Sequence, residues 1–178
     1  MTVYTNTFHS PIGNIVLASN GSELTGLWFE GQKYFGSTLA PESEVKDLPI
    51  FTDAFLWLET YFAGKDPGRI PALALNGSSF RRAVWDILIS IPYGQTVTYG
   101  EIARRLAKDR GVTTMSAQAV GGAVGHNPIS IIVPCHRVVG TGGSLTGYAG
   151  GIDKKVRLLE LEGVDMRCFS VPTKGTAI

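Results

Sequence analysis

Cysteine is scarce in this sequence: its 178 residues include only Cys135 and Cys168. Two cysteines are too few for the disulfide framework on which small secreted domains depend. The three histidines, His9, His126 and His136, form no metal-ligand spacing with them. We therefore expect free thiols, a reducing compartment and no bound metal.

Long hydrophobic runs are also missing, and none approaches the length of a membrane span. The first residues, Met1 to Tyr4, lack the basic-then-apolar pattern of a secretory signal. Hydrophobic residues nevertheless make up 44% of the chain, which argues against disorder. We expect a globular, cytoplasmic protein without membrane contact, built from one domain or two small ones.

Net charge is small, at +1, but it is unevenly divided along the chain. Through Gly77 there are four basic and eight acidic residues, giving 4 − 8 = −4. From Ser78 to Val139 there are seven basic and three acidic residues, giving 7 − 3 = +4. A basic half suits a polyanion such as nucleic acid, although such an excess is as often a solvated face.

The first half has the pattern of a small sheet followed by one helix. Short runs rich in β-forming residues are separated by turn residues, among them Asn20-Gly21, a strong hairpin signal. These runs are Val3 to Phe8, Asn14 to Ser19 and Leu24 to Phe29. From Phe51 to Phe62 the apolar spacing becomes helical. Core packing explains the aromatic residues of this helix, and nothing in this half predicts chemistry.

The second half begins after a stretch rich in Pro, Gly and Ser, residues 66–79, which indicates a domain boundary. A helix capped by Ser78 or Ser79 should then run to about Ile89. Thr98 and Glu101 have capping-box spacing, which predicts another helix from Tyr99. Ser116 can cap the next helix, from Ala117 to about His126, and a last helix should follow from about Asp153. Two helices joined by a short turn in a basic half outline a DNA-binding motif, although helical hairpins occur in many folds.

The helix from Ala117 is unusually rich in small residues, including Gly121, Gly122 and Gly125. Glycine inside a helix costs roughly 0.5 to 1 kcal/mol relative to alanine, so its use here indicates a close approach. Two partners fit, separately or together: the strand that carries Cys135, or a nucleic-acid backbone with the N-terminus of the helix toward a phosphate.

The stretch from Ile131 to Val139 is the most distinctive. Its β-branched residues end at Pro134, and Cys135 and His136 follow side by side. The pattern predicts a short buried strand that stops at the proline. A thiol with a pKa of about 8.5 needs a base at neutral pH, and His136 is the obvious candidate. Neighbours in a strand point to opposite faces, so a kink or a bridging water has to connect Cys135 with His136. The alternative interpretation is a buried structural cysteine beside an incidental histidine.

These motifs together resemble the O6-alkylguanine-DNA alkyltransferases, also called methylated-DNA–protein-cysteine methyltransferases. The family signature proline-cysteine-histidine-arginine-valine is present without a gap, from Pro134 to Val138. Asn127-Pro128 precedes it, and Gly147-Tyr148 and the run from Leu158 to Gly163 follow. The resemblance extends from Ser10 to Gly163 and is strongest after Phe80.

The resemblance implies an irreversible transfer of the alkyl group from O6-alkylguanine in duplex DNA to Cys135, once per molecule. It implies a relay from Cys135 through water to His136 and Glu162. Asn127 would shape the pocket, and Tyr148 would assist the leaving guanine. No metal or organic cofactor is implied.

Binding to DNA is implied for a second set of residues. The helix from Ala117 is similar to one that enters the minor groove, and Tyr99 matches a tyrosine beside the phosphate 3′ to the flipped nucleotide. Most members carry an arginine where this chain has Gln118, so base extrusion here would lack that charge. The residues expected to contact DNA are Tyr99, Gln118, Ala119, Gly122 and Arg137.

The expected fold is mixed α/β (α+β), with a small N-terminal sheet-plus-helix domain and a mainly helical C-terminal domain that holds a helix-turn-helix and a buried active-site strand. The expected domains are residues 1–76, ribonuclease H-like by resemblance, residues 77–165 for DNA binding and transfer, and a tail of residues 166–178. We expect a monomer that binds double-stranded DNA containing O6-alkylguanine. The rival functions are a cysteine hydrolase and a sensor that binds alkylated DNA without repairing it.

Overall fold

The computed structural model describes residues 2–172, which divide into two compact units. The first unit contains the residues up to Asn76 together with Pro128–Ile132. The second contains Gly77–Asn127 and the chain from Val133 onward. The sequence predicted a division after residue 76 but gave no sign that five later residues return to the first unit.

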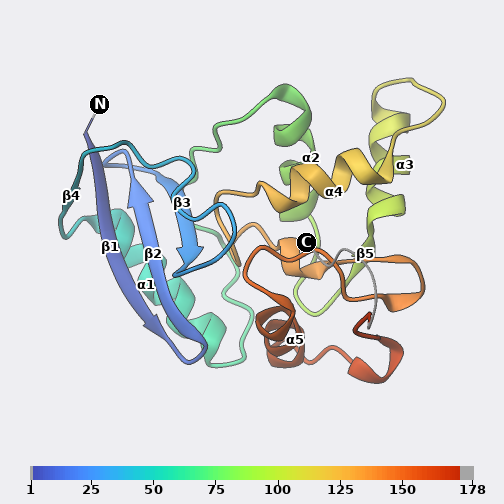
Figure 1. The fold of residues 1–178 in the computed structure, drawn as a ribbon. Helices are drawn as coiled ribbons and strands as arrows, with labels where there is room; N and C mark the ends of the chain where they lie inside the picture. The colour runs from blue at the N-terminus through green and yellow to red at the C-terminus, as the bar shows by residue number, and fades with distance from the viewer. Residues whose placement is uncertain (1, 173–178) are drawn as a thin grey trace. The chain divides into compact units, whose positions relative to one another are not determined.

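The first unit is built on a four-stranded sheet in the order β3-β2-β1-β4 (Figure 1). Its strands are β1 (Val3–Ser10), β2 (Gly13–Ser19), β3 (Leu24–Phe29) and β4 (Ser43–Val45). Neighbours β1, β2 and β3 pair antiparallel, and β4 pairs parallel to β1. The three predicted strands and the Asn20-Gly21 hairpin are confirmed. All three residues of β4 are exposed, so no apolar alternation marked that strand in the sequence.

One helix, α1 (Pro49–Phe62), completes this unit. Its Phe51, Ala54 and Leu58 are buried, as their helical spacing predicted. The returning segment covers the open edge of β3, because Leu27 N donates to Pro128 O at 2.9 Å and Ser130 N donates to Leu27 O at 2.9 Å. The edge of the sheet is thus closed by residues about one hundred positions later in the chain.

The second unit is mainly helical. Its helices are α2 (Ser79–Ile89), α3 (Tyr99–Asp109), α4 (Ala117–Gly125) and α5 (Ile152–Leu161). The predicted caps are present: Ser78 and Ser116 accept hydrogen bonds from the first turns of α2 and α4, and Thr98 and Glu101 form a complete capping box on α3. α2, α3 and α4 pack together (Figure 1), and Trp85 Nε1 donates to Ala123 O at 2.9 Å.

The expected buried strand at Ile131 to Val133 is not formed. Ile131 has a φ of +68°, and Ile132 N and Cys135 N each donate to the carbonyl two residues earlier. The chain turns here because it passes from one unit to the other. After Pro134 it forms a 3-10 turn, η1 (Cys135–Arg137), and only then the two-residue strand β6 (Val138–Val139), which pairs parallel with β5 (Val97–Thr98).

The chain after β6 forms a loop, a helix and two short turns within the second unit. A glycine-rich loop with the short turn η2 (Thr141–Gly143) leads to α5, and η3 (Met166–Cys168) follows. Leu145 N donates to Ser170 O at 2.8 Å, so the first part of the expected tail is attached to this loop. Phe169 packs against the buried cluster of Val139, Leu145 and Leu159. The rest of that tail, residues 173–178, lies outside the described residues.

Across residues 2–172, none of the helices has the length and apolar character that a membrane span requires.

Candidate active site

Cys135 begins the 3-10 turn and is only 4% exposed. Asn127, just past the end of α4, donates from Nδ2 to Val133 O at 2.8 Å and to Cys135 Sγ at 3.2 Å. One amide therefore fixes the turn and contacts the thiol. Burial raises the pKa of the Cys135 thiol, although the Asn127 hydrogen bond and the charge of Lys155 oppose that shift. At neutral pH the resting sulfur is a thiol that needs a base before it can attack.

His136 and Glu162 form a buried pair. The imidazole is fully buried, and its Nε2 lies 2.7 Å from Glu162 Oε1. An ionised carboxylate only accepts hydrogen bonds, so Nε2 carries the proton and Nδ1 is the basic nitrogen of a neutral ring. Burial lowers the pKa of His136 despite the opposing effect of Glu162. The resting imidazole is therefore neutral and can accept a proton.

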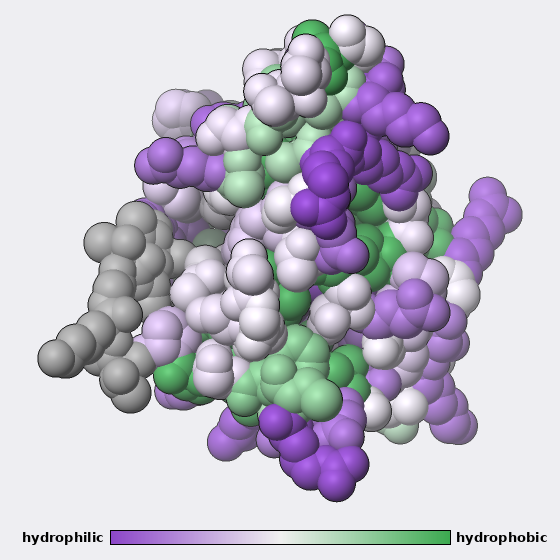
Figure 2. Space-filling view, turned by 90° about the vertical axis from the view of Figure 1, so that its right-hand side faces the viewer, coloured by the Kyte–Doolittle hydropathy of each residue, from purple (hydrophilic) through white to green (hydrophobic). Residues whose placement is uncertain are grey.

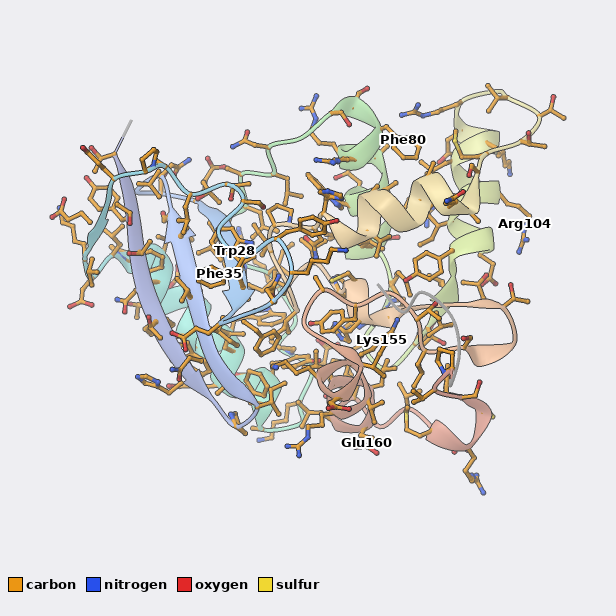
Figure 3. The ribbon with its side chains drawn as sticks, viewed as in Figure 1. Trp28, Phe35, Phe80, Arg104, Lys155 and Glu160 are labelled. Carbon is orange, nitrogen blue, oxygen red and sulfur yellow. The ribbon has the colours of Figure 1, made fainter. Side chains whose placement is uncertain are left out.

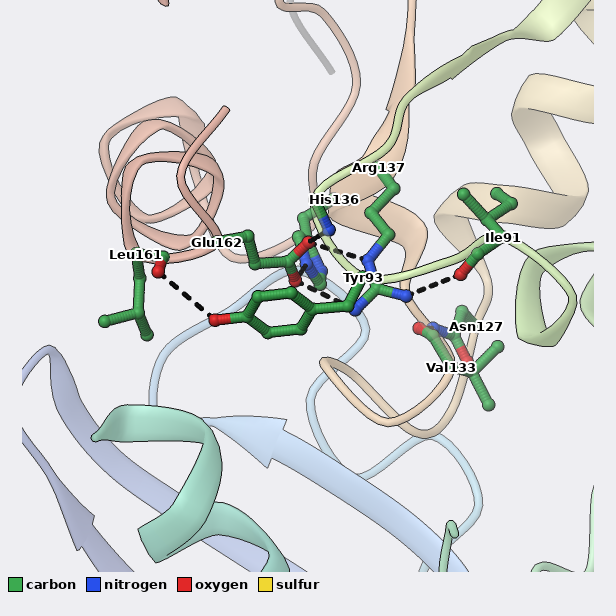
Figure 4. A network of polar contacts seen from close by, with 9 residues as sticks. Ile91, Tyr93, Asn127, Val133, His136, Arg137, Leu161 and Glu162 are labelled. Atoms are coloured by element: carbon green, nitrogen blue, oxygen red, sulfur yellow. Dashed lines mark hydrogen bonds and ion pairs between the residues drawn. The ribbon is translucent and has the colours of Figure 1, made fainter. Parts of the chain in front are cut away.

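Arg137 completes the network around this carboxylate (Figure 4). Its Nε donates to Glu162 Oε2 at 2.9 Å, its Nη2 donates to Oε1 at 3.0 Å, and its Nη1 donates to Ile91 O at 2.6 Å. Gly94 N also donates to Glu162 Oε2, at 2.9 Å. Burial alone would raise the pKa of Glu162, but the hydrogen bonds and charges of His136 and Arg137 outweigh it and lower that pKa to about 2.

A second buried cation, Lys155, lies beside the same site. Its side chain points from α5 into the unit, whereas Arg104 points outward from α3 (Figure 3). Lys155 Nζ donates to Val138 O at 2.6 Å and to Thr146 O at 2.7 Å. Burial lowers its pKa to about 8, against the influence of Cys135. The ammonium ties β6 to the glycine-rich loop and is the nearby positive charge that favours a thiolate.

Two side chains hold the glycine-rich loop by its carbonyl groups: Lys155 and Tyr99. Tyr99 donates its hydroxyl to Thr146 O and Gly147 O, each at 3.2 Å. Burial, with a smaller influence of Cys135, raises the pKa of Tyr99. Tyr148, next in the loop, is 4% exposed, and its ring lies edge-on to that of His136 at a centroid distance of 6.4 Å. The structure thus brings Tyr148 to the predicted site, and it places the Tyr99 hydroxyl against the loop.

Three of the residues expected to contact DNA share one exposed face of α4: Gln118, Ala119 and Gly122. Apart from the chain neighbours and the backbone of α4 itself, no atom of the described residues lies within 4 Å of a Cβ added at Gly122 or Gly125, and at Gly121 it would only reach ordinary contact with Tyr99, at 3.9 Å. Of the two explanations for this glycine-rich helix, close packing of its glycines against the segment that carries Cys135 is therefore not supported within the described residues. The space in front of Gly122 is open to an external partner.

Exposed basic side chains lie on and after the neighbouring helix α3: Arg104, Arg105, Lys108 and Arg110. Figure 2 shows strongly hydrophilic side chains gathered beside paler surface on the side of the molecule where α3 lies. A cavity of about 500 Å³ between α3 and the connection to α4 has Arg104 and Lys108 in its lining.

Within residues 2–172, no group of three or more His, Cys, Asp or Glu side chains could hold a metal ion.

Two features of the site were missed or misplaced by sequence reasoning. Arg137 was expected at DNA, but it is 7% exposed and its guanidinium is bound to Glu162 and Ile91. Lys155 was not singled out, because lysine is normally exposed. Its position on the helix was the available signal, because position 155 shares one face with positions 158, 159 and 162, and Leu158 and Leu159 on that face are buried.

Comparison with family models gives two matches. Residues 79–164 match the DNA-binding domain described as that of 6-O-methylguanine DNA methyltransferase, and residues 3–68 match the ribonuclease-like domain of the same protein. The ribonuclease-like match ends at residue 68 and the DNA-binding match begins at residue 79, both within the stretch of residues 66–79 that the sequence marked as a boundary.

Curated relatives agree with the family models. A methylated-DNA–protein-cysteine methyltransferase of Mycobacterium tuberculosis is 46% identical over 160 residues, which are 90% of this chain and 92% of the relative. One of Methanosarcina acetivorans is 44% identical over 162 residues, with 90% and 99% of the two chains covered. Among solved structures, the Mycobacterium tuberculosis protein in complex with DNA matches with a TM-score of 0.76 at 46% identity, covering 89% of this chain and 92% of that one.

Proposed function

The chain belongs to the family of methylated-DNA–protein-cysteine methyltransferases, and from this premise we propose that it repairs DNA by moving the alkyl group of O6-alkylguanine onto Cys135. The single observation that carries the proposal is the buried constellation of Cys135, Asn127, His136 and Glu162 in the same unit as an open-faced α4. A structural cysteine would need none of these partners.

The proposed reaction begins with deprotonation. The thiol proton passes through a bridging water to Nδ1 of the neutral His136, while Glu162 stabilises the imidazolium that forms. The sulfur then attacks the alkyl carbon in line, an S–C bond forms and the bond from that carbon to O6 breaks. The guanine leaves with a hydrogen bond or proton from Tyr148. The product is a thioether that water does not reverse, so each molecule acts once.

DNA binding is proposed for α4. The target atom lies within the base stack, so the nucleotide has to flip out to reach Cys135. The exposed face of Gln118, Ala119 and Gly122 supports close approach of α4 to the minor groove, and Gln118 would face the space that the flipped nucleotide leaves. The basic residues on and after α3 would contact phosphates without reading sequence. Tyr99 would approach the phosphate from the start of α3, at the edge of the loop that it holds.

We further propose that the protein acts as a monomer in the reducing cytoplasm. All the side chains of the site come from one unit of one chain, and both cysteines are free thiols. The expected domain roles follow from the same reasoning, with the first unit as a scaffold and the second carrying DNA binding and transfer.

The experiment that tests this function is intact-protein mass spectrometry after incubation with duplex DNA carrying one O6-methylguanine. We expect one added methyl group per molecule, and none in Cys135→Ser. Tight binding to the lesion without a mass change would show a damage sensor instead. Repeated turnover of an ester or amide substrate with a burst would indicate a cysteine hydrolase.

A further inference from the structure

Arg137 is only 7% exposed, and its polar atoms are bound within the protein. Each nitrogen of its guanidinium binds within the unit: Nε and Nη2 to Glu162, and Nη1 to Ile91 O. Its charge also lies over the ring of Tyr93, 5.7 Å from the centroid. Its donors are directed at the carboxylate of the relay, so its function has to be sought there.

The two oxygens of Glu162 are shared in an ordered way. Oε1 accepts from His136 Nε2 at 2.7 Å and from Arg137 Nη2 at 3.0 Å, whereas Oε2 accepts from Arg137 Nε and from Gly94 N, both at 2.9 Å (Figure 4). Arginine thus spans both oxygens and leaves the imidazole one of them. The planar guanidinium suits this two-pronged contact, which lysine cannot reproduce.

Charge balance explains why a second cation is useful here. A buried glutamate whose sole ionic partner is a histidine favours the imidazolium, because the pair is then neutral. An imidazolium has a proton on Nδ1 and cannot accept another from the thiol. With Arg137 present, the carboxylate is already balanced, and protonation of His136 would add an uncompensated buried charge.

We propose that Arg137 is a positioning residue that balances the charge of Glu162 and thereby keeps His136 neutral until the thiolate forms. When Cys135 loses its proton to His136, the new negative sulfur balances the new imidazolium. The inference rests on the proposed function, because it concerns the base in that reaction.

The other groups facing His136 determine how far the pKa of His136 can change when Arg137 is removed. Glu162 at the end of α5 favours the imidazolium, and Lys155 on α5 opposes it. Cys135 precedes the histidine in the same turn, and the edge-on ring of Tyr148 is uncharged. Lys155 remains when Arg137 is replaced, so the expected change in His136 is partial.

The test is the pH dependence of single-turnover methyl transfer in Arg137→Gln and Arg137→Lys. In Arg137→Gln the charge is lost, the pKa of His136 rises, and the acid limb of the profile should move up by about one pH unit. In Arg137→Lys the charge stays, so the limb should keep its wild-type position while the rate falls about 10- to 100-fold from misplacement of Glu162. Arg167→Gln is the matched control, because Arg167 pairs with Asp165 in an exposed ion pair, and its profile should not move.

A second measurement keeps the inference separate from the proposed function. The ring signals of His136 in DNA-free protein can be titrated by NMR, with the signals assigned by their absence in His136→Asn. We expect a higher pKa in Arg137→Gln than in wild type and an unchanged pKa in Arg137→Lys. Equal titration of His136 in all three proteins would overturn the role of Arg137. Failure of the wild type to take up a methyl group would instead overturn the proposed function, and the titration would still be readable.

Discussion

The two units bury different kinds of polar group. Among the described residues of the first unit, the buried polar side chains are uncharged: Thr5, Ser19, Gln32 and Ser130. In the second unit the buried set is dominated by ionisable side chains: His136, Arg137, Lys155 and Glu162, with Asn127 beside them. A buried charge costs several kcal/mol unless it is paired and hydrogen-bonded, so a fold that needs only stability does without it. The concentration of charge in one unit therefore marks where chemistry is expected.

The largest expected effect is acid destabilisation of the second unit through Glu162. The pKa of Glu162 is lowered to about 2 in the folded protein, so its contribution to stability is complete above its usual pKa and is lost as the pH falls toward 2. The loss amounts to about 3 kcal/mol. Urea denaturation at a series of pH values from 5 to 2.5 measures it, with hydrogen exchange to show which unit opens.

The matched control uses another glutamate of the same helix. Glu160 is exposed on α5 (Figure 3), so Glu160→Gln should keep the wild-type acid dependence. Glu162→Gln should be less stable at neutral pH and show a flatter dependence. If the first unit opened before the second on acidification, the contrast between the units would be wrong.

A buried hydrogen bond between uncharged groups in the second unit tests whether the pH dependence of stability arises from buried charge or from that unit as a whole. Trp85→Phe removes the donor to Ala123 O and should lower the free energy of unfolding by about 1 to 2 kcal/mol without changing its pH dependence. Trp57 in the first unit is the comparison, because its buried Nε1 has no hydrogen-bond partner among the described residues. Trp57→Phe should cost less, and an equal cost in urea denaturation would mean that ring volume, not the hydrogen bond, decides both.

Substitution of the glycines in α4 can show whether a change that stabilises the protein also weakens its binding to DNA. Gly122→Ala should raise the free energy of unfolding by about 0.5 to 1 kcal/mol, because alanine favours a helix and its Cβ would crowd no other segment among the described residues. The same methyl group should weaken binding to DNA if α4 lies in the groove. Gly121→Ala, whose Cβ turns toward Tyr99, should gain stability without losing affinity. Equal affinity for both variants, measured by fluorescence anisotropy, would remove α4 from the DNA interface.

The smallest expected effect concerns Gln118. Gln118→Arg adds one charge on the exposed face of α4, so the slope of log affinity against log salt concentration should steepen by about 0.9. Titration of a labelled duplex at several salt concentrations measures this slope. An unchanged slope would mean that a charge at position 118 does not approach the DNA, which contradicts the proposed place of α4 in the groove.

Local signals carried most of the fold. Ser78, Thr98 and Ser116 fixed three helix starts, because a capping side chain acts on backbone groups within its own turn. The path from Ile131 to Cys135 could not be predicted, because its bends arise where the chain leaves one unit for the other. The partners of Arg137 were equally hidden, because Ile91 and Glu162 are distant in sequence and only tertiary packing brings them together.

The return of Pro128–Ile132 to the first unit has a consequence for how the chain matures. During synthesis the sheet emerges first, but the edge of β3 stays incomplete until a segment some hundred residues later has left the ribosome. Cutting the chain after residue 76 would leave that edge open on the N-terminal fragment. The C-terminal fragment would expose Ile129, Ile131 and Ile132, which are all buried in the intact protein. Exposed apolar segments and unpaired strand edges promote aggregation. We therefore expect the two halves to be soluble only when expressed together.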